Sequence, residues 1–329
     1  MFKGSVRWSS SYTRNVSPKV AELSSRHLTA AASSANDSSA APNHFNFLSS
    51  RLSYHWETLP PTEAQLSHAK RFFERERPQF LWSAPKFHSM AFGDSPEVCF
   101  LGRSNVGKSS ILNALLGAKM AHTSSKKGRT RTMNAFAVGG SEQNSNNRLV
   151  VLDMPGYGKG GHSEWGVEII KYLGRRKQLK RAFLLVDGDH GPKGSDLTMI
   201  QLFNEHKVPF QVILSKIDKI LAPSRAKRAP SGHEFSHRLD HLDKILESTK
   251  SMLQEDPELD EGHLAGEIIS CSSEPGFYGR NLGIGAVRFA MLRAAGLHFQ
   301  PEVKLAPAVE IVPHEEIFSM QGRPNKAGS

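Results

Sequence analysis

Cysteine is scarce in this chain, whose 329 residues include only Cys99 and Cys271, and neither belongs to a C-x-x-C pair. This scarcity excludes a disulfide-rich scaffold and argues against a zinc site built from cysteines, so we expect both residues to be small members of a buried core. Long apolar runs are also missing, since none approaches the ~20 residues that a bilayer crossing needs. We therefore expect a protein with no membrane span.

Acidic residues are nearly missing from positions 1–50, which hold five Lys or Arg residues against only Glu22 and Asp37. The segment is rich in serine and alanine and lacks the apolar core of a secretory signal. Arg-bearing, Ser-rich and acid-poor N-termini are typical of organelle transit peptides, and a generic disordered tail is the alternative. We expect residues 1–50 to be a disordered transit peptide that directs the protein to the mitochondrial matrix, although the plastid stays open.

From residue 97 onward, short apolar runs alternate with helical stretches. The runs cover 98–101, 149–152, 182–186, 210–214 and 267–270, and the helical stretches cover 110–117, 164–177, 196–206, 237–253 and 286–296. This alternation predicts an α/β fold with a mostly parallel sheet covered on both faces. Residues 63–78 predict a short helix that ends at Pro78. We expect an N-terminal extension over 51–92, the α/β domain over 93–298 and a C-terminal tail over 299–329.

A glycine-rich motif, GRSNVGKSS, begins at Gly102, directly after an apolar run and directly before a helical stretch. It satisfies G-x-x-x-x-G-K-[ST] with Gly102, Gly107, Lys108 and Ser109. Glycines let backbone N–H groups wrap phosphates, and the start of a helix adds positive potential. We predict a phosphate loop in which Lys108 reaches the terminal phosphates and the Ser109 hydroxyl ligates magnesium. The other loop residues predicted to bind the nucleotide are Ser104, Asn105, Val106 and Ser110.

A second motif, SKID (215–218), follows the run 210–214 at the sheet edge where bases are recognised. A carboxylate at Asp218 can accept both the ring N–H and the exocyclic amino group of guanine, and adenine offers no such pair of donors. We predict that Asp218 selects guanine and that the stem of Lys216 lies across the base; a solvated loop is the alternative. The residues expected to offer backbone N–H groups to the base carbonyl are Cys271, Ser272 and Ser273.

Residues 233–237 spell HEFSH, which matches the H-E-x-x-H pattern of zinc peptidases. On a helix, His233 and His237 would share a face with Glu234 between them. The pattern lies on a predicted helix whose other face is apolar, and no third ligand has a suitable spacing. We interpret it as a solvated helix and keep a zinc peptidase as a competing hypothesis.

Five segments in order resemble the EngB family: GRSNVGKSS, KKGRTRTMNAF (126–136), DMPGYG (153–158), SKID and CSSEPGFYGRNLGIGAV (271–287). That family consists of Ras-like translational GTPases of bacteria and organelles that assist assembly of the large ribosomal subunit. The resemblance covers about residues 96–297. It implies a Ras-like P-loop GTPase domain with a mostly parallel six-stranded sheet, GTP or GDP as ligand, and Mg²⁺.

The resemblance also implies roles for single residues. By position, the residues that hold magnesium are Ser109, Thr130 and Asp153. Gly128 lies in the same segment as Thr130 and contributes to nucleotide binding. The Gly156 N–H contacts the terminal phosphate, so that Lys108, Thr130 and Gly156 act in catalysis.

Two positions and one insertion depart from common GTPase patterns. Ser215 stands where the family usually has threonine and most GTPases asparagine; we expect it to lose the reach to the phosphate loop and to weaken affinity. Tyr157 stands where many GTPases carry a water-orienting glutamine, so slow intrinsic hydrolysis is expected. The insertion lies around residues 222–234.

A formal charge of +10 favours a polyanionic partner. Basic runs lie at 126–131, 175–181 and 225–228, and any one of them alone can be a solvated face. Together with the resemblance, they predict a monomeric GTPase that acts in assembly of an organellar large ribosomal subunit and contacts its rRNA. The alternative is a nucleotide-dependent adaptor for RNA or protein with negligible hydrolysis.

Overall fold

The computed structural model describes residues 51–91, 93–121, 132–140, 147–157, 163–221, 231–254, 263–274 and 282–299. The chain divides into two units, residues 1–50 and 51–329, and every described residue belongs to the second unit. The expected transit peptide therefore lies outside the described residues, as does the expected tail from residue 300 onward.

A single sheet of eight strands, in the order β1-β8-β7-β6-β3-β5-β4-β2, runs through the described part of the chain. The pairs β3–β5, β3–β6, β6–β7 and β7–β8 are parallel, and the pairs β1–β8, β2–β4 and β4–β5 are antiparallel. The predicted α/β fold with a mostly parallel sheet is confirmed. The strands are β1 (Ser53–His55), β2 (Gln79–Ala84), β3 (Glu97–Gly102), β4 (Met133–Val138), β5 (Leu149–Asp153), β6 (Leu179–Asp187), β7 (Phe210–Ser215) and β8 (Glu267–Ser270).

The expected number of six strands is wrong, because the extension over 51–92 adds β1 and β2 at the two edges of the sheet. β1 is three residues long, and β2 lies between Pro78 and Pro85 with most of its residues at least partly exposed. Edge strands are held by backbone pairing on one side and need no continuous apolar run. Their sequences therefore lack the pattern that marks the buried strands.

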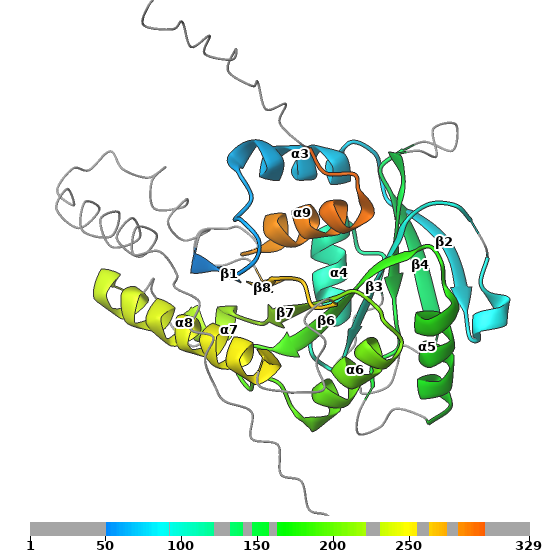
Figure 1. Ribbon diagram of the computed structural model, residues 1–329. Coiled ribbons are helices and arrows are strands. Elements are labelled where there is room, and N and C mark those ends of the chain that lie inside the picture. Colours follow the sequence, from blue (N-terminus) through cyan, green and yellow to red (C-terminus); the bar gives the residue numbers. More distant parts are fainter. Residues whose placement is uncertain are drawn as a thin grey trace, which may run out of the picture. The chain divides into compact units, whose positions relative to one another are not determined.

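Helices cover both faces of this sheet, as predicted (Figure 1). The helices α3 (Glu63–Glu74), α4 (Lys108–Leu116) and α9 (Ile284–Ala295) lie on one face, where they share an apolar core with the strands. The other face carries α5 (Ser163–Arg175), α6 (Gly194–Glu205), the short α7 (Asp218–Leu221) and α8 (Gly232–Gln254). A 3₁₀ turn over Phe87–Ser89 precedes β3.

Helix α3 begins with a capping box and ends earlier than the sequence predicts. Thr62 Oγ1 accepts a bond from Gln65 N (3.3 Å), and Gln65 Oε1 accepts one from Thr62 N (2.9 Å). The helix ends at Glu74 rather than at Pro78, and Phe73 on its inner face is buried in the core that it shares with α9. The extension is thus packed onto the sheet by its helix as well as by its two strands.

A buried carboxylate, Glu267 on β8, joins the extension to the rest of the sheet. It accepts bonds from Thr58 (2.9 Å) and from Gln211 Nε2 (2.7 Å), lies 3.0 Å from His55 Nδ1, and pairs with Arg293. Burial raises the pKa of Glu267, but the bond from His55 and the positive charge of Arg293 outweigh it and lower the pKa to about 2. The ionised carboxylate is therefore strongly stabilised in the folded state.

Replacing Glu267 with glutamine should lower the free energy of unfolding at neutral pH by about 3 kcal/mol, because the pKa falls from 4.5 to about 2 on folding. A lowered pKa gives a contribution that is complete above the unfolded value and is lost as the pH falls from about 4.5 towards 2. Urea unfolding of both proteins at about pH 7 and about pH 3 measures this effect.

The difference in unfolding free energy between wild type and Glu267→Gln should shrink at the lower pH. The exposed Glu247→Gln on α8 is the matched control and should follow the wild type at both pH values. A difference that stays the same at both pH values would contradict the assignment to Glu267.

Candidate functional site

The segments selected from the sequence meet at one edge of the sheet. Gly102 is the last residue of β3, Asp153 the last of β5 and Ser215 the last of β7, and Ser272 follows β8 closely. Because β3, β5, β7 and β8 run parallel, their carboxyl ends lie at the same edge. In open parallel sheets this is the edge at which ligands bind.

The loop after β3 has the backbone of a phosphate-binding loop. Asn105 has φ 66°, and Gly107, with φ 99°, is the N-cap residue directly before α4. A Cβ at Gly102 would lie 2.8 Å from Val106 Cγ1 and 3.0 Å from the Leu185 carbonyl, so a side chain does not fit there. The first N–H groups of α4, a nine-residue helix, therefore face the space enclosed by this loop.

Lys108 and Asp153 form a buried ion pair at the start of α4. The lysine side chain is 6% exposed and the aspartate side chain 2%. Nearby, Ser104 Oγ is buried and has no hydrogen-bond partner in the part of the chain that the structure describes. The phosphate loop with the start of α4 thus presents a cation and a free hydroxyl, and the end of β5 adds a carboxylate that pairs with the cation.

Ser215 and Lys216 hold the second motif against the phosphate loop. Ser215 Oγ lies 2.8 Å from the Val106 carbonyl and 3.0 Å from the Val186 carbonyl. The expectation that serine loses the reach to the loop is therefore wrong, because the Val106 backbone comes close enough for a hydroxyl. Lys216 Nζ donates to the Asn105 carbonyl (2.6 Å) and to Asp187 Oδ2 (2.9 Å).

The ion pair between Lys216 and Asp187 favours the ionised form of the Asp187 carboxylate. Burial raises the pKa of Asp187, but the hydrogen bond and the positive charge of Lys216 outweigh burial, and the pKa lies below its ordinary value. The stem of Lys216 passes over Gly107, since a Cβ on that glycine would meet Lys216 Cε at 3.6 Å. The lysine therefore links the base motif to the start of α4.

Asp218 is oriented by a serine hydroxyl. Ser272 Oγ donates to Asp218 Oδ1 (2.6 Å) and accepts a bond from Glu274 N (3.0 Å). The Cys271 N–H donates to the Leu214 carbonyl (2.7 Å) and the Ser272 N–H to the Leu282 carbonyl (3.0 Å). The expectation that all three residues 271–273 offer N–H groups to a base is thus wrong for the first two, because the fold uses these donors; Ser273 remains.

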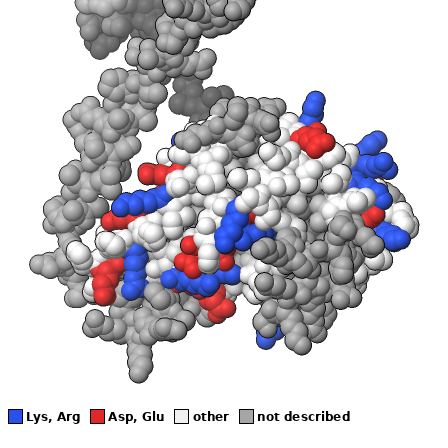
Figure 2. Space-filling model, turned by 90° about the horizontal axis from the view of Figure 1, so that it is seen from below, with Lys and Arg blue, Asp and Glu red and all other residues white. Residues whose placement is uncertain are grey.

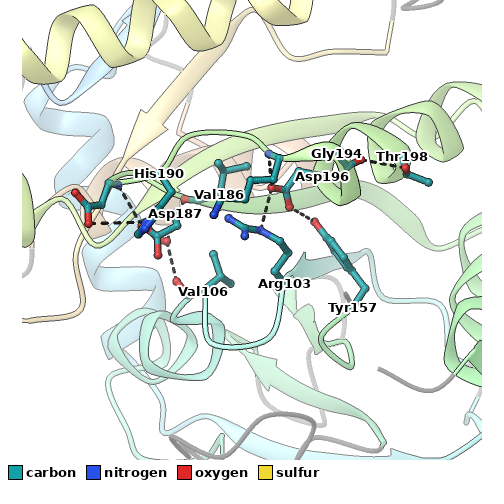
Figure 3. A network of polar contacts seen from close by, with 12 residues as sticks. Arg103, Val106, Tyr157, Val186, Asp187, His190, Gly194, Asp196 and Thr198 are labelled. Atoms are coloured by element: carbon teal, nitrogen blue, oxygen red, sulfur yellow. Dashed lines mark hydrogen bonds and ion pairs between the residues drawn. The ribbon is translucent and has the colours of Figure 1, made fainter. Parts of the chain in front are cut away.

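A polar cluster that the sequence did not reveal lies beside the phosphate loop (Figure 3). The Tyr157 hydroxyl donates to Asp196 Oδ1 (2.8 Å), and Arg103 Nε lies 3.0 Å from Asp196 Oδ2. Burial and the charge of Asp196 raise the pKa of Tyr157 well above its ordinary value, so the hydroxyl keeps its proton. Arg103 occupies a free position of the G-x-x-x-x-G motif, where no sequence signal marks it.

The remaining predicted residues have three different outcomes. Gly128 and Thr130 lie outside the described residues. Gly156 lies against Ser104 of the phosphate loop, where an added Cβ would meet Ser104 Oγ at 3.1 Å. Ser109 and Ser110 are half-buried in the first turn of α4.

The HEFSH segment forms the start of α8, and its residues cap a helix. Glu234 Oε2 accepts a bond from Ser231 N (2.9 Å), and Glu234 N donates to Ser231 Oγ (3.3 Å). Within the described ranges, the one cluster with metal-ligand spacing consists of Asp187, Asp189 and His190, so the two histidines of the segment do not gather such a set. His233, Glu234 and His237 are exposed on this helix, which agrees with the solvated-helix interpretation.

The basic run 175–181 is only partly a surface patch. Arg176 is buried and bonds to Glu97 Oε2 (2.9 Å) and the Ala91 carbonyl (2.9 Å). Arg181 bonds to Gln211 (3.1 Å), and burial and the nearby Arg293 lower its pKa to about 10. On the face drawn in Figure 2, Lys and Arg side chains lie among Asp and Glu side chains. The run therefore offers less positive surface than its sequence suggests.

None of the helices in the described ranges combines the length and the apolar character that crossing a bilayer requires.

Comparison with known proteins identifies the family. Residues 97–216 match a family described as "50S ribosome-binding GTPase". The chain is 35% identical to the probable GTP-binding protein EngB of Gluconobacter oxydans, over 70% of this chain and 92% of that protein. It is 31% identical to MIOREX complex component 8 of Saccharomyces cerevisiae, over 72% of this chain and 76% of that protein.

Among solved structures, the chain is similar to that of a probable GTP-binding protein engB, at 22% identity and a TM-score of 0.39. The match covers 61% of this chain and 98% of the other. The sequence relatives carry the assignment, because both cover at least 70% of this chain at 30% identity or more. The chain belongs to the EngB family and is a P-loop GTPase.

Proposed function

We propose that this chain binds GTP together with Mg²⁺ and hydrolyses GTP while it acts in assembly of the large ribosomal subunit in the mitochondrial matrix. The observation that carries the proposal is the buried Lys108–Asp153 pair, enclosed by a phosphate loop at the carboxyl edge of the sheet. The ribosomal partner rests on the family description, "50S ribosome-binding GTPase". The mitochondrial location rests on the acid-poor, Ser-rich residues 1–50.

The described residues fit a magnesium-bound nucleotide. Asp153 and Ser109 offer the oxygen ligands that Mg²⁺ prefers. Ser104, whose Oγ is buried without a hydrogen-bond partner among the described residues, lies in the phosphate loop between β3 and α4. When bound, the metal ion would neutralise negative charge on the phosphates. Lys108 would exchange Asp153 for the terminal phosphates, so that neither buried charge is left without a partner.

Guanine selection rests on the residues after β7 and β8. Asp218, held by Ser272, would accept the two guanine donors, while the stem of Lys216 would cover the base. The Ser273 N–H is the remaining candidate donor to the base carbonyl. Thr130 and Gly128 keep their proposed role in a switch loop that closes on the third phosphate.

The reaction is attack of water on the terminal phosphate. Lys108 and the Gly156 N–H would stabilise the charge that develops on the phosphate oxygens. Positioning of the water and the terminal phosphate would supply most of the remaining rate enhancement. Tyr157 does not orient the water, because its hydroxyl is donated to Asp196. We therefore propose a slow intrinsic rate that the ribosomal partner raises, and a domain over 93–298 that works as a monomer with the extension 51–92 packed onto it.

Isolated mitochondrial large ribosomal subunits should raise GTP turnover by the wild-type chain at least about 10-fold, because a partner that completes the active site can add far more than this. Phosphate release measured with and without the subunits tests the prediction, and small subunits at the same concentration are the control. A rate that no subunit changes would favour the adaptor hypothesis over an enzyme stimulated by the ribosome.

A further inference from the structure

Two side chains from separate elements, Arg103 and Tyr157, meet at the carboxylate of Asp196, which lies on a third element (Figure 3). Tyr157 comes from the segment after β5, Arg103 from the phosphate loop, and Asp196 from the first turn of α6. One carboxylate oxygen accepts the Tyr157 hydroxyl (2.8 Å); the other accepts the Lys193 N–H (2.9 Å) and lies 3.0 Å from Arg103 Nε. We call Arg103, Tyr157 and Asp196 the tyrosine anchor.

The backbone of Tyr157 is also tied to the phosphate loop. Ser104 N donates to the Tyr157 carbonyl (3.1 Å), and Tyr157 N donates to the Gly102 carbonyl (3.3 Å). Arg103 and Tyr157 thus form a parallel bridge that continues the pairing of β3 with β5 beyond the ends of both strands. Side chain and backbone therefore fix the same residue to the same loop.

Gly156, the residue before Tyr157, lies directly on this loop. A Cβ at this position would lie 3.1 Å from Ser104 Oγ and 3.2 Å from Ser104 Cα and N, so the two backbones are in close contact. The position of the Gly156 N–H is therefore set by how firmly Tyr157 is held. A shift of Tyr157 away from Asp196 would carry Gly156 with it.

We propose that Tyr157 is a positioning residue whose hydroxyl, held by the Arg103-paired carboxylate of Asp196, presets the Gly156 N–H for the terminal phosphate of GTP. This inference rests on the proposed function, because it assumes that GTP occupies the phosphate loop. The anchor contacts no part of the ligand itself. It acts through Gly156, so it stabilises binding of a nucleotide with a third phosphate and leaves binding of GDP unchanged.

The anchor has a position suited to this role. Asp196 is fully buried, accepts hydrogen bonds from Lys193 N and from the Tyr157 hydroxyl, and forms an ion pair with Arg103, so α6, the segment after β5 and the phosphate loop share one carboxylate. A buried carboxylate loses more when a donor is removed than an exposed one, because no water replaces the bond. Removing the tyrosine hydroxyl should therefore free the segment 153–157 without removing any group that contacts nucleotide.

Tyr157→Phe tests the proposal, because it removes the hydroxyl and keeps the ring. Affinities for GDP and for a non-hydrolysable GTP analogue are measured with fluorescent nucleotides in wild type and variant. We expect the affinity for the analogue to fall about 10-fold, the loss typical of one hydrogen bond to a charged acceptor, and the GDP affinity to stay within about 2-fold. Arg103→Gln should also lower the ratio of the affinity for the analogue to the affinity for GDP. In the double variant this ratio should fall by less than the two single effects combined.

Tyr172→Phe is the matched control. Tyr172 is also a buried tyrosine, and its hydroxyl donates to Glu97 (3.1 Å) at the opposite end of β3. It should lose stability in thermal unfolding while keeping the wild-type ratio of the two affinities. Any of three outcomes for Tyr157→Phe overturns the proposal: an unchanged ratio, an equal loss for both nucleotides, or tighter binding of the analogue. Failure of the wild type to bind either nucleotide would instead overturn the proposed function.

Discussion

Replacing Lys108 with alanine should lower the affinity for both GTP and GDP at least about 100-fold and abolish turnover. Lys108 is the buried cation of the phosphate loop, and a charge-assisted bond to phosphate in such a site exceeds an ordinary hydrogen bond. Calorimetric titration of the purified variant with each nucleotide, and phosphate release with GTP, measure the two losses.

The same substitution leaves Asp153 buried without its partner, so the variant should also unfold at a lower temperature. Thermal unfolding separates this loss from misfolding, because a folded variant still melts cooperatively. The matched control is Lys119→Ala, which removes an exposed lysine shortly after α4 and should bind as the wild type does. Wild-type affinity and rate in Lys108→Ala would refute the site.

Exchanging Asp218 for asparagine should weaken GTP binding at least about 100-fold and shift preference towards xanthine nucleotides. The asparagine amide can accept one guanine donor, but its NH₂ group faces the exocyclic amino group, so donor opposes donor. Xanthine has a carbonyl at that position and restores the pairing. Competition of GTP and XTP for the variant, followed by fluorescence, measures the change.

The Ser272 hydroxyl is expected to keep its bond in this variant, because the asparagine carbonyl oxygen still accepts it. The loss should thus come from the base rather than from a collapsed loop. Asp94→Asn, an exposed carboxylate before β3, is the control and should keep the wild-type preference. Unchanged selectivity for GTP over XTP in Asp218→Asn would rule out its proposed role.

The sequence predicts the central fold well because its inner strands are buried on both faces. β3, β5, β6 and β7 lie within three residues of their predicted bounds, since each contains a continuous apolar run. The same runs locate the site, because a parallel sheet brings the ends of its strands to one edge. The edge strands β1 and β2 escape prediction, because pairing on one side gives no such run.

The site is predicted less completely than the fold, and each failure has a physical reason. Arg103 and Asp196 lie 93 residues apart, at 103 and 196 in the chain, so no local pattern connects them. Side-chain length alone predicts too short a reach for Ser215, whereas the close approach of the Val106 carbonyl decides whether the hydroxyl reaches the loop. Arg176 belongs to a basic run that predicts a charged surface, but it is buried, because it pairs with Glu97 on β3.

Co-sedimentation with mitochondrial large ribosomal subunits, compared between GDP and a non-hydrolysable GTP analogue, tests the central claim most directly. A GTP-dependent assembly factor should pellet with the subunits in the presence of the analogue and stay in the supernatant with GDP, because only the analogue carries the third phosphate that the proposed switch would sense. Lys108→Ala should stay in the supernatant with either nucleotide. Equal pelleting of the wild type in both states, or no pelleting in either, would contradict the account.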